Sequence, residues 1–326
     1  MTKETHPSDI QSYLEDRGMT FRDVSFLAQG EYSLNYLARG DEDVVVRLVT
    51  GSQIGLSLQE QAPYEHHALE LLSGSGVTPK PYFVDPSPEN LSYPVVVEEF
   101  LPGEPLDYSK DIRSAARCIA AIHALGVPGD HGLQLHPDPA PAILAESREL
   151  ATPYLEWPDA TEESKSGLRN GFTRIEAFLE QEDLFTGDDL AIVNYDLNTH
   201  NFVVDHDQAK LLDWEKARIA PITQDLAHFL LPTTTLWRDA SATLLSKEQE
   251  QDFIDAYLEN NPIRDVERFH TQLAAMRTIV SLRAVSWCAW ALQETARSSR
   301  PIVNEETLSK SRTYLEPEFL ARLFAT

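Results

Sequence analysis

The chain contains few cysteines and lacks a long apolar run. Only two cysteines occur among its 326 residues, Cys118 and Cys288. Each lies in an apolar helical pattern, so we expect reduced core thiols rather than a disulfide framework or a metal site. No apolar segment approaches the roughly 20 residues that cross a bilayer, and the polar N-terminus has no signal-peptide core. The sequence therefore predicts a cytoplasmic protein.

Basic residues are also scarce, and lysine most of all. The chain has 52 Asp and Glu against 27 Lys and Arg, a formal net charge of -25, and only eight of the basic residues are lysines. A surface of this sign repels nucleic acid and anionic membranes, so neither is an expected partner. Acidic excess with little lysine is typical of salt-in halophiles, where molar salt shortens the Debye length to about 3 Å. We expect a halophilic source; an ordinary acidic cytosolic enzyme is the alternative.

Periodicity divides the chain into two lobes, as its length also suggests. Residues 21–30, 32–40 and 43–51 alternate apolar and polar residues between glycine turns, which predicts a three-stranded antiparallel meander. A helix that stops at glycines follows at 63–76, and 80–106 supplies two more strands. The pattern after residue 109 is mostly helical. A composition shift near residues 99 to 105 places the boundary between lobes 1–99 and 100–326.

The segment 192–215, IVNYDLNTHNFVVDHDQAKLLDWE, carries polar residues at the ends of strand-like runs. Asp196 is followed five residues later by Asn201, and Asp213 comes twelve residues after that. Scaffold strands can aim such residues into a cleft, and oxygen ligands of this kind suit Mg²⁺. Taken singly, Asp196 would be read as an Asx-turn residue and Asn201 as a left-handed turn residue. Their combination favours a metal and phosphate site.

Three motifs in order carry a family resemblance. NYDLNTHNFVV, then LLDWEKA, then QDLAHFL resemble the motif run of the aminoglycoside phosphotransferase and choline kinase family. The resemblance covers most of the chain. It implies an α+β, bilobal, protein-kinase-like fold, with a small antiparallel sheet in the N-lobe and a mostly helical C-lobe. The family pattern H-G-D-x-x-x-x-N has Asn194 and Tyr195 here in place of histidine and glycine.

The resemblance also implies roles at the catalytic loop. Asp196 would orient a substrate hydroxyl and accept its proton. Asn201 and Asp213 would hold Mg²⁺ against ATP, and Glu215 would support the metal site without binding the ion. Asn194 can form hydrogen bonds in place of the family histidine, which braces the loop.

The nucleotide site is implied in the N-lobe. LAQGEYSLNYLA resembles the nucleotide loop, with backbone amides near Gly30 and Ser33 facing phosphates; a simple hairpin turn fits that stretch equally well. Arg47 stands where kinases usually carry a phosphate-pairing lysine, and its guanidinium can hold phosphate oxygens in a fork. Glu65 occupies the helix position that pairs with this cation, and Glu60 is the less favoured candidate.

The stretch VVVEEFLPGE looks like the hinge between the lobes. The backbone around Glu98 to Phe100 would form hydrogen bonds with adenine, without the acidic side chains. ATP is preferred to GTP by family frequency only.

Three further polar residues are predicted to be structural or secondary. His123, in a helical pattern, is expected to pack in the core, and Asp225 to brace the catalytic loop. His200 is expected to be a turn or substrate-facing residue rather than a base.

A pair of tryptophans gives the only indication of the acceptor. Trp287 and Trp290 are three residues apart and share a helix face, and W-x-x-W followed by Gln293 resembles the segment of choline kinases that helps build the aromatic choline site. Core packing is the simpler interpretation. On the functional interpretation the rings would face a cationic amine, which is favoured over a neutral sugar.

The sequence therefore predicts an ATP- and Mg²⁺-dependent small-molecule kinase, a phosphotransferase with an alcohol group as acceptor. A nucleotide-binding pseudokinase with a regulatory partner is the alternative, because Asn194 and Tyr195 depart from the family pattern. A protein kinase is disfavoured, because no A-P-E segment follows Asp213. The sequence specifies neither the substrate nor an oligomeric state.

Overall fold

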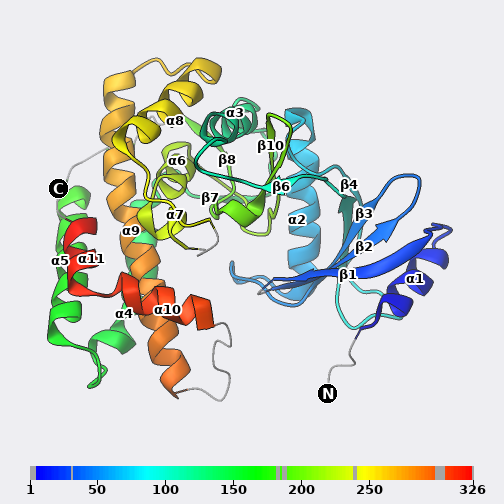
Figure 1. Ribbon diagram of the computed structural model, residues 1–326, viewed down its shortest axis with the longest axis horizontal. Helices are drawn as coiled ribbons and strands as arrows, with labels where there is room; N and C mark the ends of the chain where they lie inside the picture. The colour runs from blue at the N-terminus through cyan, green and yellow to red at the C-terminus, as the bar shows by residue number, and fades with distance from the viewer. Residues whose placement is uncertain are drawn as a thin grey trace.

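The chain folds into an N-terminal sheet region and a mostly helical C-terminal region (Figure 1). This arrangement confirms the predicted α+β, bilobal, kinase-like fold. The computed structural model describes residues 5–30, 32–180, 184–185, 189–237, 241–297 and 305–324.

The N-terminal region is built on a five-stranded antiparallel sheet of order β1-β2-β3-β5-β4. The predicted meander forms the first three strands, and the two later strands add to the β3 edge with β5 innermost. β3 is buried at every position, because α1 packs on one face of the sheet and α2 on the other. The strands are β1 (Asp23–Gln29), β2 (Ser33–Arg39), β3 (Val44–Val49), β4 (Pro81–Asp85) and β5 (Val95–Glu99).

Helix α2 (Leu58–Leu72) joins the two regions, and the short helix η1 (Ser73–Ser75) continues it. Ser57 and Glu60 form a capping box at the start of α2, with Glu60 Oε2 accepting from Ser57 N at 2.9 Å. The buried face carries Gln61 and Glu65 at helical spacing. Gln61 Nε2 donates to Glu215 O at 2.8 Å, so α2 fixes the sheet against the loop that carries the LLDWEKA motif.

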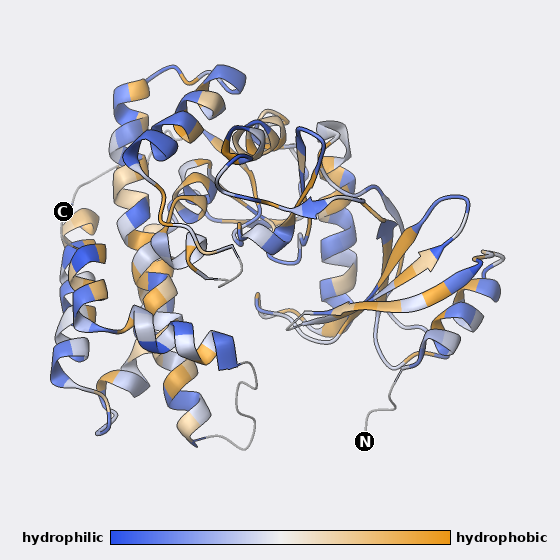
Figure 2. Ribbon diagram, in the orientation of Figure 1, coloured by the Kyte–Doolittle hydropathy of each residue, from blue (hydrophilic) through white to orange (hydrophobic). Residues whose placement is uncertain are grey.

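The C-terminal region packs around one long helix, α9 (Val266–Arg297), which contacts α4, α5, α6 and α10. Figure 2 shows hydrophobic residues concentrated in the strands of the N-terminal sheet and along α9. The other helices are α1 (Pro7–Glu15), α3 (Ile112–His123), α4 (Ala140–Leu155), α5 (Glu162–Leu179), α6 (Thr223–Phe229), α7 (Pro232–Thr235), α8 (Lys247–Asn260), α10 (Glu305–Tyr314) and α11 (Pro317–Leu323).

Two small three-stranded sheets, β10-β9-β6 and β7-β11-β8, lie where the C-terminal region meets α2. They place the loops that carry the sequence motifs. Their strands are β6 (Glu104–Pro105), β7 (Gln134–Leu135), β8 (Leu190–Val193), β9 (Phe202–Asp205), β10 (Gln208–Leu211) and β11 (Arg218–Pro221).

Cys118 and Cys288 are free and buried, as predicted, and belong to the main core cluster. None of the described helices combines the length and the apolar character that a bilayer span requires.

Candidate functional site

The loop after β8 begins with Asn194, whose side chain ties the loop to the segment that carries Asp213. Asn194 Nδ2 donates to Asp213 O at 2.8 Å, and its Oδ1 accepts from Asp196 N at 3.0 Å. The side chain is fully buried, so these hydrogen bonds are shielded from water. Asparagine at this position therefore supplies loop-bracing contacts.

Asp225 on α6 holds the same loop from the other side. Its carboxylate accepts from Asn194 N at 2.8 Å and from Tyr195 N at 2.9 Å, which confirms the bracing role predicted for Asp225. His123 lies behind it in the core, as predicted, with Nε2 3.5 Å from Asp225 Oδ2 and Nδ1 2.9 Å from Tyr257 Oη.

Tyr195 takes the position of the family glycine and has the left-handed backbone that glycine adopts most easily, with φ of 72°. Its ring is buried, and two guanidinium groups lie over it. The guanidinium carbons of Arg218 and Arg283 are 3.8 Å and 4.4 Å from the ring centroid. Stacking of this kind holds a bulky side chain at a backbone conformation it would otherwise avoid.

Asp196 projects from this braced loop into a contact with Lys216, whose Nζ lies 2.7 Å from Asp196 Oδ2. Burial alone would raise the pKa of Asp196, but the ammonium of Lys216 and further polar neighbours lower it to about 2. Asp196 is therefore ionised at neutral pH. The sequence analysis did not identify Lys216. The chain has only eight lysines, and the position of one of them inside the LLDWEKA motif could have indicated its role.

The β9–β10 hairpin brings Asn201 next to Asp213. Phe202 pairs with Leu211, and the ladder continues with Leu212 N donating to Asn201 O at 2.7 Å. Asn201 Nδ2 donates to Asp196 O at 2.7 Å, which leaves the amide oxygen to act as a ligand. Asp213 has a φ of 60°, so the chain turns sharply at the carboxylate.

Arg47 reaches across the site from β3. Its Nε lies 2.8 Å from Glu65 Oε1 and its Nη2 lies 2.9 Å from Asp213 Oδ1, while Glu60 caps its own helix instead. Burial opposes the charge, but Glu65 and Asp213 raise the pKa of Arg47. Arg47 therefore stays charged and links the two lobes.

Carboxylates outnumber cations around Arg47. Burial raises the pKa of Glu98 to about 7 and that of Glu215 to about 8, with the charge of Asp213 adding to both shifts. The site thus has an excess of carboxyl groups that an added cation would stabilise in their charged form. Within the described ranges, no three His, Cys, Asp or Glu side chains are arranged to hold a metal. One carboxylate and one amide oxygen are a donor set that fits Mg²⁺, which also binds phosphates and water.

Among the other residues predicted to bind nucleotide, Glu98 lies close enough to Arg47 and Asp213 for their charges to act on it, and Gly30 and Phe100 have backbone amides that are already hydrogen-bonded. Gly30 N donates to Ser33 O at 2.9 Å, which closes the turn between β1 and β2, so this amide is not available to phosphate. Phe100 N likewise donates to Asp43 O at 3.1 Å.

The two predicted tryptophans share a face of α9, and Trp237 after α7 joins them. The ring centroids of Trp237 and Trp287 are 5.8 Å apart, and those of Trp287 and Trp290 are 6.2 Å apart. Trp287 packs against the main core cluster, whereas Trp290 is half-exposed. Thr199 Oγ1 lies 3.1 Å from Ser241 Oγ, so the chain just beyond Trp237 returns to the catalytic loop.

His200 in the same loop is exposed, and its backbone N–H donates to Asn198 Oδ1 at 3.0 Å. It is a turn residue here.

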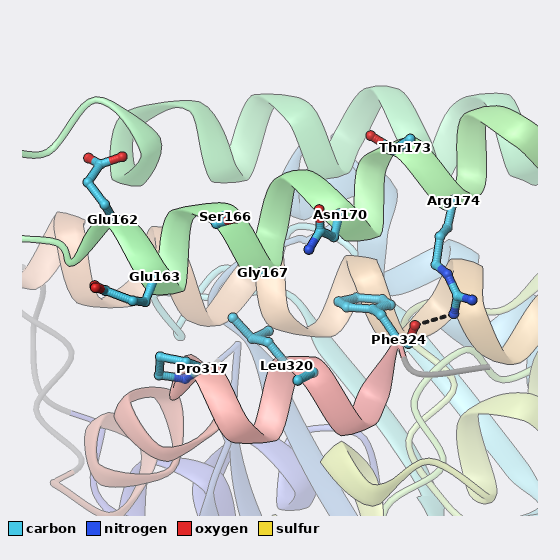
Figure 3. A pocket seen from close by; sticks show the side chains of 11 residues that line it. Glu162, Glu163, Ser166, Gly167, Asn170, Thr173, Arg174, Pro317, Leu320 and Phe324 are labelled. Carbon is cyan, nitrogen blue, oxygen red and sulfur yellow. Dashed lines mark hydrogen bonds between the residues drawn. The ribbon is translucent and has the colours of Figure 1, made fainter.

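A separate groove of about 800 Å³ lies between α5 and α11 (Figure 3). Gly167 and Gly171 line one face of α5, and a Cβ at Gly167 would come within 2.7 Å of Leu320. Close helix packing accounts for both glycines. Arg174 donates to Phe324 O at one end of the groove. None of the motif residues lines it, so this groove is distinct from the site described above.

Solved structures share this architecture along nearly the whole chain. A spectinomycin phosphotransferase in complex with ADP and spectinomycin matches with a TM-score of 0.70 at 12% identity, covering 99% of both chains. The choline kinase LicA from Streptococcus pneumoniae matches with a TM-score of 0.61 at 18% identity, covering 98% of both chains. The macrolide 2'-phosphotransferase MphH from Brachybacterium faecium matches with 0.62 at 18% identity, over 94% of this chain and 98% of its own. The fold is that of the kinase-like phosphotransferases.

Sequence comparison assigns the chain to a family within this fold. The model of the phosphotransferase enzyme family matches residues 23–270, well over half of the chain. The chain therefore belongs to this phosphotransferase family. No curated protein sequence matches it.

Proposed function

We propose that this chain is an ATP- and Mg²⁺-dependent kinase that transfers a phosphoryl group to a hydroxyl of a small molecule. One observation carries the proposal: Asp196, Asn201 and Asp213 converge on one site, and Arg47 closes it from the other lobe. Transfer of a γ-phosphoryl group asks a protein mainly to position the reactants and to offset charge on phosphate oxygens.

The nucleotide half of the site uses residues of both lobes. Arg47 would bind phosphate oxygens once Asp213 turns to the metal, and Glu65 would keep its guanidinium in place. Asn201 Oδ1 and Asp213 would hold Mg²⁺, which neutralises developing phosphate charge when bound. Glu215 would add negative charge nearby without binding the ion. The stretch from Glu98 to Phe100 and the turn at Gly30 and Ser33 would border the nucleotide.

The acceptor half centres on Asp196. As a carboxylate with a low pKa, Asp196 is a weak base that orients the attacking hydroxyl and takes its proton late, when the phosphoryl group has largely transferred. Lys216 would shield the carboxylate and keep it ionised.

The acceptor itself is proposed to carry a cationic amine. Trp287 and Trp290 present aromatic surface on α9, the helix whose Arg283 stacks on Tyr195 of the loop, and a cation over such a ring gains roughly 0.5 to 2 kcal/mol. The solved relatives are named as kinases or phosphotransferases of spectinomycin, of macrolides and of choline. Each of these acceptors is a small molecule that carries a hydroxyl group.

A nucleotide-binding pseudokinase is the second candidate, favoured by Asn194 and Tyr195. The hydrogen bonds of Asn194 and the stacking on Tyr195 both support a formed loop, so catalysis is preferred.

The test is Mg²⁺-dependent turnover of ATP across a library of hydroxyl compounds, together with nucleotide binding by two variants. Asp213→Ala should abolish the Mg²⁺-dependent part of nucleotide affinity, because a carboxylate ligand and its charge are lost. Arg47→Ala should weaken ATP more than adenosine. Mg²⁺-dependent ATP binding without turnover of any acceptor would favour the pseudokinase, and equal losses for ATP and adenosine would remove Arg47 from the phosphates.

We further propose that the protein works in a cytoplasm of high salt. The net charge of -25 and the eight lysines support this setting.

A further inference from the structure

Among the described residues, one cation beside the loop of residues 194–201 has no ion-pair partner. Arg218 at the start of β11 is half-buried; its Nε donates to Lys216 O at 3.3 Å, and its guanidinium stacks on Tyr195. Within the part of the chain that the structure describes, no carboxylate lies within ion-pair distance of Arg218, and its two terminal nitrogens have no hydrogen-bond acceptor. These two nitrogens therefore remain available to a ligand.

The nearby acidic groups are already engaged. Glu146 on α4 binds Arg283 with both oxygens, at 3.0 Å from Nε and 2.9 Å from Nη2. Asp196 binds Lys216. Arg283 and Lys216 thus each form an ion pair, and Arg218 has none with any of the described carboxylates.

This imbalance is unusual for its setting. The chain has 52 acidic residues, and none of those described supplies a partner for this half-buried guanidinium. Burial lowers the pKa of Arg218, which reflects the cost of holding an unpaired charge away from water. An anion bound at this position would offset that cost.

Arg218 lies beside the residue that precedes Asp196, although it also pairs with Gln134 of β7 and lies near Tyr64 of α2. Tyr195 immediately precedes Asp196, and Glu146 and Arg283 come from helices of the C-terminal region. Arg47, which is proposed to hold phosphates, comes instead from β3, and the proposed Mg²⁺ ligands Asn201 and Asp213 flank the β9–β10 hairpin.

We propose that Arg218 binds a carboxylate of the acceptor whose hydroxyl Asp196 orients. The assignment rests on the proposed kinase function and deepens it. A planar guanidinium matches a carboxylate with two parallel hydrogen bonds, and Arg218 has two free nitrogens at its end. A dianionic phosphate would call for a second free cation, and Arg283 and Lys216 are both paired. Trp287 and Trp290 lie on the same helix as Arg283, which shares the Tyr195 ring with Arg218. A hydroxylated amino acid could therefore place its carboxylate on Arg218 and its amine on the tryptophans.

The experiment compares matched acceptors. Glycerate, serine and gluconate are each assayed beside the corresponding primary amide, with ATP and Mg²⁺ in high potassium chloride. Amino-alcohols and neutral sugars complete the panel. Wild type, Arg218→Gln and Arg218→Lys are measured, with Arg113→Gln as control, because Arg113 is on the surface and pairs with Asp252 and Glu259. Calorimetric binding of each acid and amide, and of ATP with Mg²⁺, is recorded for every variant.

At least one acid should bind and react with a KM about 10- to 100-fold below that of its amide, the size expected for a charge-assisted hydrogen-bonded pair. Arg218→Gln should remove this preference by raising the KM for the acid alone, Arg218→Lys should retain part of it, and Arg113→Gln should change nothing. Unchanged ATP affinity shows that the variants are folded. Turnover confined to amides, amines or neutral sugars, or an acid preference that survives Arg218→Gln, would overturn the carboxylate site and leave the kinase standing. If no acceptor reacts, the kinase proposal fails, and acid binding that depends on Arg218 decides the site separately.

Discussion

At the scale of single residues, the site depends on how Asp196 is charged. Burial and ion pairing act on this carboxyl in opposite directions, and Lys216 decides the outcome at a distance of 2.7 Å. The same opposition applies to Glu98 and Glu215, where burial prevails and the pKa rises. The difference is that Asp196 forms a direct ion pair with Lys216 at 2.7 Å, whereas Glu98 and Glu215 feel the nearby cations without such a contact.

Replacing Asp196 with asparagine should lower turnover by roughly 10²-fold or more, the usual size of a base and positioning effect. Nucleotide affinity should stay close to wild type, because Asp196 is not a proposed metal ligand. Steady-state kinetics and ATP titration measure the two effects. Asp205→Asn is the control, an exposed aspartate at the end of β9. Turnover near the wild-type level would remove Asp196 from the mechanism.

Replacing Lys216 with methionine should introduce an acid limb into the pH profile of kcat/KM. In the wild type, Asp196 is ionised down to a pKa of about 2, and this adds stability that is present above its ordinary pKa of 3.8 and lost as pH falls. Without the ammonium, burial raises the pKa of Asp196, so activity should fall as pH drops through the new value. Lys110→Met, at an exposed site, should leave the profile unchanged. A variant whose pH profile matches that of the wild type would show that Lys216 does not set this pKa.

At the scale of elements, the loop of residues 194–201 is held by side chains from several distant segments. Asp225 and His228 come from α6, with His228 Nδ1 accepting from Leu197 N at 2.9 Å, and Arg283 comes from α9. A loop braced in this way can carry the left-handed Tyr195 because the surrounding contacts outweigh the local strain.

The Tyr195→Gly substitution tests whether the backbone strain at Tyr195 or the packing of its side chain has the larger effect on stability. Glycine relieves a left-handed conformation that costs roughly 1–2 kcal/mol, but it removes a buried aromatic side chain whose loss costs about 3–5 kcal/mol. We therefore expect a net loss of about 2 kcal/mol in the free energy of unfolding, measured by denaturant titration, with reduced turnover.

His206 is the matched control for this prediction. It also has a left-handed backbone, with φ of 52°, but its side chain is 94% exposed. His206→Gly should be neutral within about 1 kcal/mol, because little packing is lost. A stabilising Tyr195→Gly would show that the arginine stacking contributes less than the backbone strain.

At the scale of the whole molecule, α2 and Arg47 connect the lobes across the site. Gln61 donates to Glu215 O, and Arg47 binds Asp213, so the relative position of the lobes is tied to groups proposed to bind metal and phosphate. The surface charge acts on the same scale, because its repulsion is spread over the entire fold.

The melting temperature should rise as potassium chloride increases from about 0.1 M toward molar concentrations, because screening reduces self-repulsion. Differential scanning calorimetry measures the shift. A neutral osmolyte at matched osmolality is the control, since it strengthens apolar burial without screening charge. A flat or falling melting temperature over that range of salt would contradict the halophilic interpretation.

The sequence by itself determined the order of elements and the spacing of the site motifs. Alternation and glycine turns specify β1 to β3. Asn201 and Asp213 are twelve positions apart and flank the β9–β10 hairpin, which brings them together because strand pairing is local there. The pairing of Arg47 with Glu65 followed from the family resemblance, but only the tertiary structure decided the other charge contacts of the loop. Lys216 reaches Asp196, and Arg283 reaches Tyr195 from 88 residues away (283 - 195). Burial and long-range packing set these contacts and the resulting pKa values, and no local spacing in the chain encodes them.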